Sequence, residues 1–223
     1  MTETTDPAGA HRVATLRATA PRATTLRATP GLPLYGLDIE TDTTIDGLDP
    51  ERSRIVAVAV SGDGVDEVVN GDEADVIAGV DQLLGGLPDG VLITWNGTRF
   101  DLPFLATRAE RAGVPIGLRL GPMPQRGAHH RRATAWHGHR HLDGLDLYRA
   151  DVGRTLGLSC ALKSLARLVG EPPVEVDRAR IHELDADTLR EYVLSDARLA
   201  RSLVRRRWAS AAAWVDPLPG RGD

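Results

Sequence analysis

Two acidic residues interrupt a strongly apolar stretch near the start of the chain, LYGLDIETD at residues 34–42. In an extended strand, alternate side chains point to opposite faces, so Asp38 and Glu40 share one face with Gly36. Carboxylates are depleted in strands, and burying one without a partner costs free energy. The stretch therefore predicts a strand whose acidic face meets a hard divalent cation, which prefers oxygen ligands. The alternative is an edge strand with its two acids in water.

Composition places the chain among ordinary globular proteins. It has 223 residues, of which 42% are hydrophobic and 26% charged, and its formal net charge is −4. This charge excludes a grossly basic nucleic-acid-binding protein but is compatible with a local basic patch. The single cysteine, Cys160, excludes an internal disulfide framework. Because we find neither a long apolar run nor a leading signal pattern, we expect a cytoplasmic protein without membrane association.

The apolar pattern divides the chain into three segments. Residues 1–31 are rich in Thr, Ala, Arg and Pro, and we expect them to form a disordered tail. Residues 32–210 carry the folded domain, and residues 211–223 form a C-terminal tail. Strand patterns within the domain cover 34–40, 54–60, 65–69 and 91–95, and helix patterns cover 73–85, 102–113, 143–152, 160–169 and 186–208. This mixture predicts an α/β or α+β fold and argues against a repeating βαβ barrel.

Another acid lies at an unexpected position in the helix pattern at 186–208. Its apolar residues form one stripe, with Asp196 at the centre and Tyr192 one turn earlier. A core-facing helix rarely places a carboxylate there without a partner. The arginines of this helix lie on the opposite side. Two explanations stay open, namely a buried salt bridge to a distant residue and a metal shared with the strand acids.

Asp101 stands where the strand pattern at 91–95 gives way to a helix pattern. Asn96-Gly97 turns the chain, and Pro103 fits the first helical turn. Asp101 can therefore be explained as a helix N-cap, as well as an acidic ligand.

Most of the histidines cluster in one stretch: His129, His130, His137, His139 and His141. The last three alternate and would share one face of a strand, which could hold a transition metal. Without thiolates or a tight signature spacing, we regard such a site as the weaker explanation. We expect the nearby Asp143 and Asp146 to be helix-start and surface acids.

Taken together, these residues resemble the three motifs of the DEDD superfamily of 3′–5′ exonucleases. Asp38-Ile39-Glu40 matches the first motif, and Asn96 with Phe100-Asp101 matches the second. Tyr192 to Asp196 matches the third in the form of the tyrosine (DEDDy) subclass. The resemblance covers roughly residues 32–208 and is similar to the proofreading domains of family B DNA polymerases. It implies a ribonuclease H-like fold, with a mixed β-sheet flanked by α-helices.

The resemblance also implies an activity and its residues. The enzyme would hydrolyse phosphodiester bonds from the 3′ end of single-stranded nucleic acid, with DNA as the expected substrate. It would release nucleoside 5′-monophosphates by a two-metal mechanism. Two divalent cations, Mg²⁺ or Mn²⁺, would be held by four acids: Asp38, Glu40, Asp101 and Asp196. Tyr192 would orient the attacking water. The implied contacts to single-stranded DNA or RNA 3′ ends are Thr41, Asn96, Phe100 and Lys163, and the implied process is DNA repair.

Other functions are compatible with the same residues. A 3′–5′ exoribonuclease or short-oligonucleotide nuclease would use the same chemistry, because nothing in the sequence separates DNA from RNA. A catalytically idle nucleic-acid-binding module would keep the fold, although the presence of all four acids and the tyrosine disfavours it. A compact metal-binding protein of unrelated purpose is disfavoured by the order of the motifs.

Overall fold

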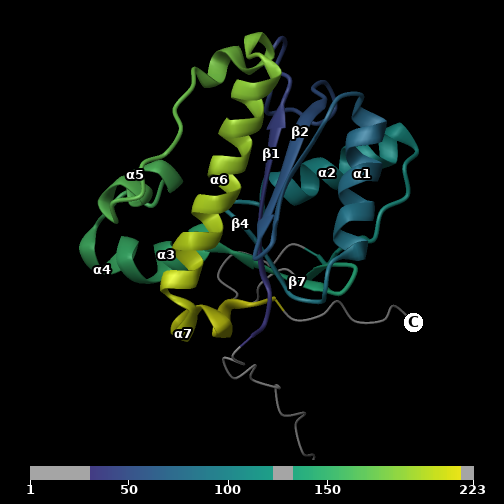
Figure 1. Cartoon of the computed structure of the whole chain (residues 1–223). Helices are drawn as coiled ribbons and strands as arrows, with labels where there is room; N and C mark the ends of the chain where they lie inside the picture. Colours follow the sequence, from purple (N-terminus) through teal and green to yellow (C-terminus); the bar gives the residue numbers. More distant parts are fainter. Residues whose placement is uncertain (1–30, 123–132, 217–223) are drawn as a thin grey trace, which may run out of the picture.

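A computed structural model describes residues 31–122 and 133–216 (Figure 1). Within these residues, seven strands form one sheet in the order β3-β2-β1-β4-β7-β6-β5. Their bounds are β1 (Leu34–Thr41), β2 (Ile55–Gly62), β3 (Val65–Asn70), β4 (Val91–Thr94), β5 (Leu118–Leu120), β6 (Thr134–Trp136) and β7 (His139–Asp143). The β1–β4 and β4–β7 pairs are parallel and the other pairs antiparallel. The predicted α/β fold with a mixed sheet is confirmed.

The acidic strand β1 lies inside the sheet, because β2 pairs with one of its edges and β4 with the other. Its side chains alternate as the sequence predicts. Leu37 and Ile39 are buried in the core beneath one face, whereas Gly36 lies against α6 (Ala186–Arg206) on the other. The edge-strand alternative for Asp38 and Glu40 is therefore wrong.

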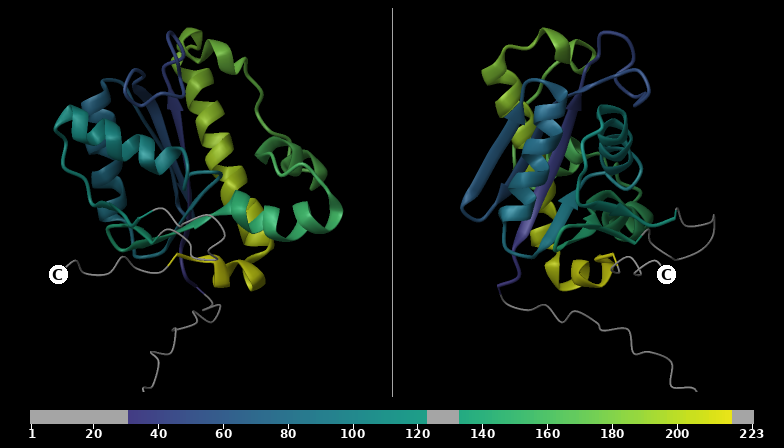
Figure 2. Two further views of the ribbon diagram at one scale, coloured as in Figure 1. Left: turned by 180° about the vertical axis from the view of Figure 1, so that it is seen from behind. Right: turned by 90° about the vertical axis from the view of Figure 1, so that its right-hand side faces the viewer.

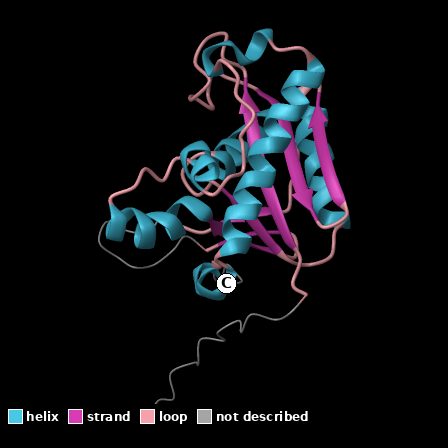
Figure 3. Ribbon diagram, turned by 60° about the vertical axis from the view of Figure 1, so that its left-hand side comes forward, coloured by secondary structure: helices cyan, strands magenta, loops and turns pink. Residues whose placement is uncertain are grey.

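Helices cover both faces of the sheet (Figures 1 and 3). The helices α1 (Glu73–Gly86) and α2 (Asp101–Ala112) pack on one face through an apolar cluster that includes Leu37, while α6 packs on the other through Val193 and Ala197. Short helical segments occupy the chain between β7 and α6 (Figure 2): α3 (Gly144–Tyr148), η1 (Arg149–Gly153), α4 (Arg154–Leu156), α5 (Leu162–Leu168) and η2 (Arg178–Glu183). In the described ranges, no helix has the length and apolar character needed to cross a membrane.

The packed region extends past the predicted domain boundary at residue 210. After α6, the chain forms α7 (Trp208–Ala211) and η3 (Ala212–Trp214), and Val215 is buried in the core. The buried Asp216 carboxylate lies 3.0 Å from Nδ1 of His141 on β7, which holds this end against the sheet. The sequence predicts a C-terminal tail from residue 211, whereas residues 211–216 pack against the domain through contacts such as those of Val215 and Asp216. Apart from Gly31, the predicted N-terminal tail lies outside the described residues.

Candidate active site

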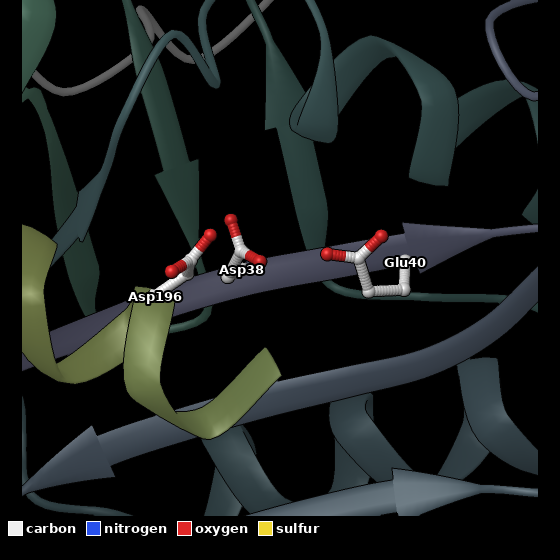
Figure 4. A group of neighbouring side chains, drawn as sticks. All are labelled: Asp38, Glu40 and Asp196. Carbon is white, nitrogen blue, oxygen red and sulfur yellow. The ribbon is translucent and has the colours of Figure 1, made fainter. Parts of the chain in front are cut away.

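Three of the predicted acids converge between β1 and α6. Asp38 and Glu40 lie on β1, and Asp196 lies on α6. Each offers one carboxylate oxygen, and these oxygens lie within 4.8 Å of one another. Figure 4 shows the Asp38 and Asp196 carboxylates side by side, with Glu40 farther along the strand. Among the described residues, this is the only group of three or more His, Cys, Asp or Glu side chains placed to hold a metal ion.

A close approach of helix and strand brings these acids together. Gly36 lies two residues before Asp38, and a Cβ built on it would overlap the carbonyl group of Ala197. Only glycine lets the α6 backbone come this near to the strand. Because Ala197 follows Asp196, the same approach sets the Asp196 carboxylate beside that of Asp38.

Asp101 lies near the edge of β1 that pairs with β4. β4 pairs with β1 only over Leu34, Tyr35 and Gly36, so the N–H of Ile39 lies beyond the end of the ladder. The buried Asp101 carboxylate lies near that N–H, which, together with the N–H of Asp101 itself, lowers the pKa of the carboxyl group against the effect of burial. The N-cap interpretation is wrong, because the cap residue is Phe100 and Asp101 is already helical. Asp101 lines the same cavity as the three converging acids but lies outside their cluster.

Asp143 holds the turn that carries the second motif. Its carboxylate accepts hydrogen bonds from the N–H groups of Asn96 and Thr98, both at 3.0 Å. It also accepts the N–H of Leu145 as the N-cap of α3, so its predicted helix-start role is confirmed. Asn96 has a φ of 75°, a conformation that asparagine adopts more readily than most residues. The predicted surface acid Asp146 pairs with Arg99 at 2.9 Å.

Burial dominates the electrostatics of the four acids. It raises the pKa of Glu40 to about 8, of Asp101 to about 7 and of Asp196 to about 6. It also raises the pKa of Asp38 well above its ordinary value, and the negative charge of Glu40 adds to that rise. In the absence of a cation, the folded protein therefore resists ionisation of these groups, as expected for carboxylates gathered around a metal position.

A lysine partly compensates the negative charge of Asp196, the acid on α6. Lys163 of α5 places its Nζ 3.6 Å from Asp196 Oδ2, so the distant salt bridge considered for Asp196 is present. The other oxygen, Asp196 Oδ1, is buried and has no hydrogen-bond partner within residues 31–122 and 133–216. An unpartnered buried carboxylate oxygen beside two further acids fits a divalent cation, because a hard cation would satisfy it.

Tyr192 lies one turn before Asp196 and is almost fully buried. Lys163 Nζ lies 4.1 Å from the centre of its ring, in a cation–π contact. Burial and then the charge of Glu40 raise the pKa of the Tyr192 hydroxyl above its ordinary value of 10.0. The hydroxyl therefore stays protonated near neutral pH and can donate a hydrogen bond.

A cavity of about 600 Å³ opens beside the carboxylates, and two predicted substrate contacts, Asn96 and Phe100, line it. Lys163 also lines it, but its Nζ donates to the Val174 carbonyl oxygen at 2.9 Å. The buried Thr41 hydroxyl donates to Gly47 within the following loop. All four stay predictions as substrate contacts.

Sequence reasoning missed two arginines that line the same cavity, Arg149 and Arg178. Arg149 lies within the helix pattern predicted at residues 143–152, Arg178 lies outside every predicted element, and neither belongs to one of the three motifs. Only the folded chain places them beside the acids.

The histidine cluster forms no metal site in the described part of the chain. His137 has a φ of 49° in the turn between β6 and β7, so the three alternating histidines do not lie on one continuous strand. His139 lies 2.8 Å from the Leu84 carbonyl oxygen, and His141 lies 2.8 Å from the Thr94 hydroxyl. His129 and His130 lie outside the described residues.

The raised pKa values predict that the metal-free protein loses stability as the pH rises. A carboxyl group with a raised folded-state pKa binds its proton more tightly in the folded than in the unfolded chain. Its stabilising effect is complete below the ordinary pKa near 4 and disappears as the pH passes the folded values of about 6 to 8. In EDTA, we therefore expect the melting temperature to fall between pH 5 and pH 8.

Mg²⁺ or Mn²⁺ should reverse this loss at pH 8, because an ion that binds only the folded state stabilises it by about 2.7 kcal/mol at 100 times its Kd. Thermal denaturation with and without each ion measures the effect. The Glu40→Gln variant is the control and should respond less to both pH and metal. A melting temperature insensitive to both ions would contradict the metal site.

Comparison with known protein families matches residues 36–181 to the RNase H superfamily. The chain belongs to the RNase H superfamily. Its predicted ribonuclease H-like fold is confirmed, while membership of the DEDDy subclass stays a prediction.

This RNase H superfamily domain is similar to parts of archaeal DNA polymerases. It is 29% identical to DNA polymerase 1 of Aeropyrum pernix over 203 residues, which cover 78% of this chain and 21% of the polymerase. It is 28% identical to a DNA polymerase of Archaeoglobus fulgidus over 88 residues, which cover 39% of this chain and 11% of that protein. The solved family B DNA polymerase of Pyrobaculum calidifontis superposes with a TM-score of 0.64 at 28% identity, over 80% of this chain and 25% of the polymerase. The domain thus spans a quarter or less of each relative.

Proposed function

We propose that this domain is a metal-dependent 3′–5′ exonuclease that acts on single-stranded nucleic acid, with DNA as the preferred substrate. The observation that carries the proposal is the convergence of Asp38, Glu40 and Asp196 beside an open cavity, where the buried Asp196 Oδ1 has no hydrogen-bond partner among the described residues. The similarity to DNA polymerases supports a nucleic-acid substrate, and the order of the three motifs supports removal of nucleotides from the 3′ end.

The acids would hold Mg²⁺ or Mn²⁺. Asp38, Glu40 and Asp196 are placed for one cation, and Asp101, across the same cavity, would act on a second. Divalent cations bound there supply a Lewis acid for the phosphoryl oxygens and lower the pKa of water. All four acids must be ionised to hold them, so we expect metal binding to release protons near neutral pH.

The remaining side chains would position the substrate. The protonated Tyr192 hydroxyl would orient the attacking water as a hydrogen-bond donor, since its raised pKa makes it a poor base. Lys163 would keep Asp196 in place, because it contacts both Asp196 and the Tyr192 ring. Phe100 would stack on a base and Asn96 would hydrogen-bond to the strand, since both line the cavity.

The test is incubation of the protein with 5′-labelled single-stranded DNA and RNA in the presence of Mg²⁺, Mn²⁺ or EDTA. We expect a ladder that shortens from the 3′ end with either metal and stays intact in EDTA, with nucleoside 5′-monophosphates as products. Faster loss of the DNA would assign DNA as the preferred polymer, and faster loss of the RNA would assign the exoribonuclease alternative.

An oligonucleotide with a blocked 3′ terminus is the control for direction and should persist. Its cleavage at internal positions would contradict the exonuclease assignment. Persistence of both polymers under every metal condition would overturn the proposed function in favour of a binding module.

A further inference from the structure

The basic residues that line the cavity differ in their partners. Lys163 forms an ion pair with Asp196 and donates a hydrogen bond to the Val174 carbonyl oxygen. Arg149 and Arg178 are exposed, and the guanidinium of neither forms an ion pair or hydrogen bond within residues 31–122 and 133–216. Many other arginines are paired. Arg198 and Arg205 on α6, for example, reach Asp66 and Asp63 at 2.7 and 2.6 Å. Two guanidinium groups are thus left available at the site.

Arg178 is the one whose charge acts on the acidic cluster. It lines the cavity together with Asp38, Glu40 and Asp196. Burial sets the raised pKa of Glu40, and the positive charge of Arg178 is the largest influence opposing it. The same charge lowers the pKa of Asp38 and Asp196 against the effect of burial. Arg178 therefore lines the same cavity as the three carboxylates without forming an ion pair with any of them.

The segment that carries Arg178 is anchored on both sides. Before it, the Val174 N–H donates to Ser195 Oγ at 3.3 Å, while its carbonyl oxygen accepts from Lys163. After it, His182 Nδ1 lies 2.8 Å from the hydroxyl of Thr43, in the loop that follows β1. The backbone is thereby held on both sides of Arg178, so little backbone reorganisation is needed to present the guanidinium to a ligand.

The charge balance indicates what that ligand is. Two divalent cations would neutralise the four acids, and Arg178 would then stand as an uncompensated cation beside them. A guanidinium presents a planar fork of donors that matches the oxygens of a phosphate group. We propose that Arg178 binds a phosphate of the nucleic-acid strand beside the metal site and positions the strand for hydrolysis. This inference rests on the proposed function for the identity of the ligand.

The test uses Arg178→Ala and measures binding of a fluorescent oligothymidylate by anisotropy, with Ca²⁺ as the cation. Loss of a hydrogen bond to a charged group should weaken binding about 10- to 100-fold. The slope of log affinity against log salt should fall by about 0.7, the value for one phosphate contact on a single strand. Arg178→Lys should restore the salt slope while regaining only part of the affinity, because lysine keeps the charge but lacks the fork.

Arg180 is the matched control, since it is exposed on the same short helix but pairs with Glu183. Arg180→Ala should leave affinity and salt slope unchanged.

A second measurement, the Mg²⁺ concentration for half-maximal thermal stabilisation, separates positioning of the strand from damage to the fold. Removing the Arg178 charge should lower that concentration about 2- to 5-fold, because a cation near the acids is lost. A structural defect would raise it instead.

Equal binding and salt slopes in wild type, Arg178→Ala and Arg180→Ala would overturn the inference, and so would a wild type that binds no strand. A wild type that binds through Arg178 but hydrolyses neither DNA nor RNA would overturn the proposed function and leave the phosphate contact standing. A wild type that hydrolyses strands, with an Arg178→Ala variant of undiminished affinity, would overturn the contact alone.

Discussion

Replacing Asp38 with Asn is expected to lower the rate of strand hydrolysis at least about 100- to 1,000-fold while stabilising the metal-free protein. The activity should fall because Asp38 lies within the cluster of three acids that would hold the cation. The stability should rise because the substitution removes a carboxyl group that burial and Glu40 keep from ionising. At pH 8 in EDTA, we expect a gain of about 1–2 kcal/mol, or roughly 2–6 °C in melting temperature.

Asp75→Asn is the matched control, because Asp75 is an exposed acid in the first turn of α1, on the face of the sheet opposite α6. It should leave both the hydrolysis rate and the melting temperature close to those of the wild type. The measurements are 3′-end degradation of labelled single-stranded DNA and thermal denaturation with and without Mg²⁺. An Asp38→Asn protein that kept most of its activity would show that the acidic cluster is not the reaction centre.

Replacing Gly36 with Ala should damage stability and activity together. The added Cβ would overlap the Ala197 carbonyl group, with its carbon only 2.9 Å away, so the backbone of α6 would have to move off β1. Overpacking costs about 1–3 kcal/mol, and a clash with backbone belongs at the upper end. For a chain of this size, we expect a fall of roughly 6–12 °C in melting temperature.

The same shift should separate Asp196 from Asp38, and a displacement of about 1 Å in a positioned site can cost about 100-fold in rate. Gly86→Ala is the control, since a Cβ at the end of α1 would meet open space. It should leave rate and melting temperature unchanged or give a slight gain in stability. Thermal denaturation and strand degradation at saturating Mg²⁺ measure both effects. Normal stability and turnover of Gly36→Ala would refute the role of this close approach.

The local pattern of the chain was sufficient for much of the fold and for the centre of the candidate site. Alternation along residues 34–42 predicts a strand with Asp38 and Glu40 on one face, and the stripe along residues 186–208 predicts that Asp196 faces the core. Both signals depend on periods of two and 3.6 residues, which the backbone geometry imposes whatever the rest of the chain does. The structure confirms both placements.

Asp101 shows where such reasoning ends. Its place at the start of a helix pattern favoured an N-cap, a local explanation that looked complete. In the structure its carboxylate is buried, lines the acidic cavity and lies near the N–H of Ile39, a group of β1 that lies beyond the end of the short ladder with β4. The length of one strand thus decides what surrounds a residue on a separate helix.

The sequence by itself determined the two elements that carry the central acids and the faces on which those acids lie. The tertiary structure alone decided which distant groups meet: Lys163 lies beside Asp196, His141 lies beside Asp216, and Arg178 lines the cavity of the acids. The physical reason is the separation along the chain over which each kind of information acts. Periodicity is read from neighbouring residues, whereas the partner of a buried charge depends on which distant segments the packing brings within a few ångströms of it.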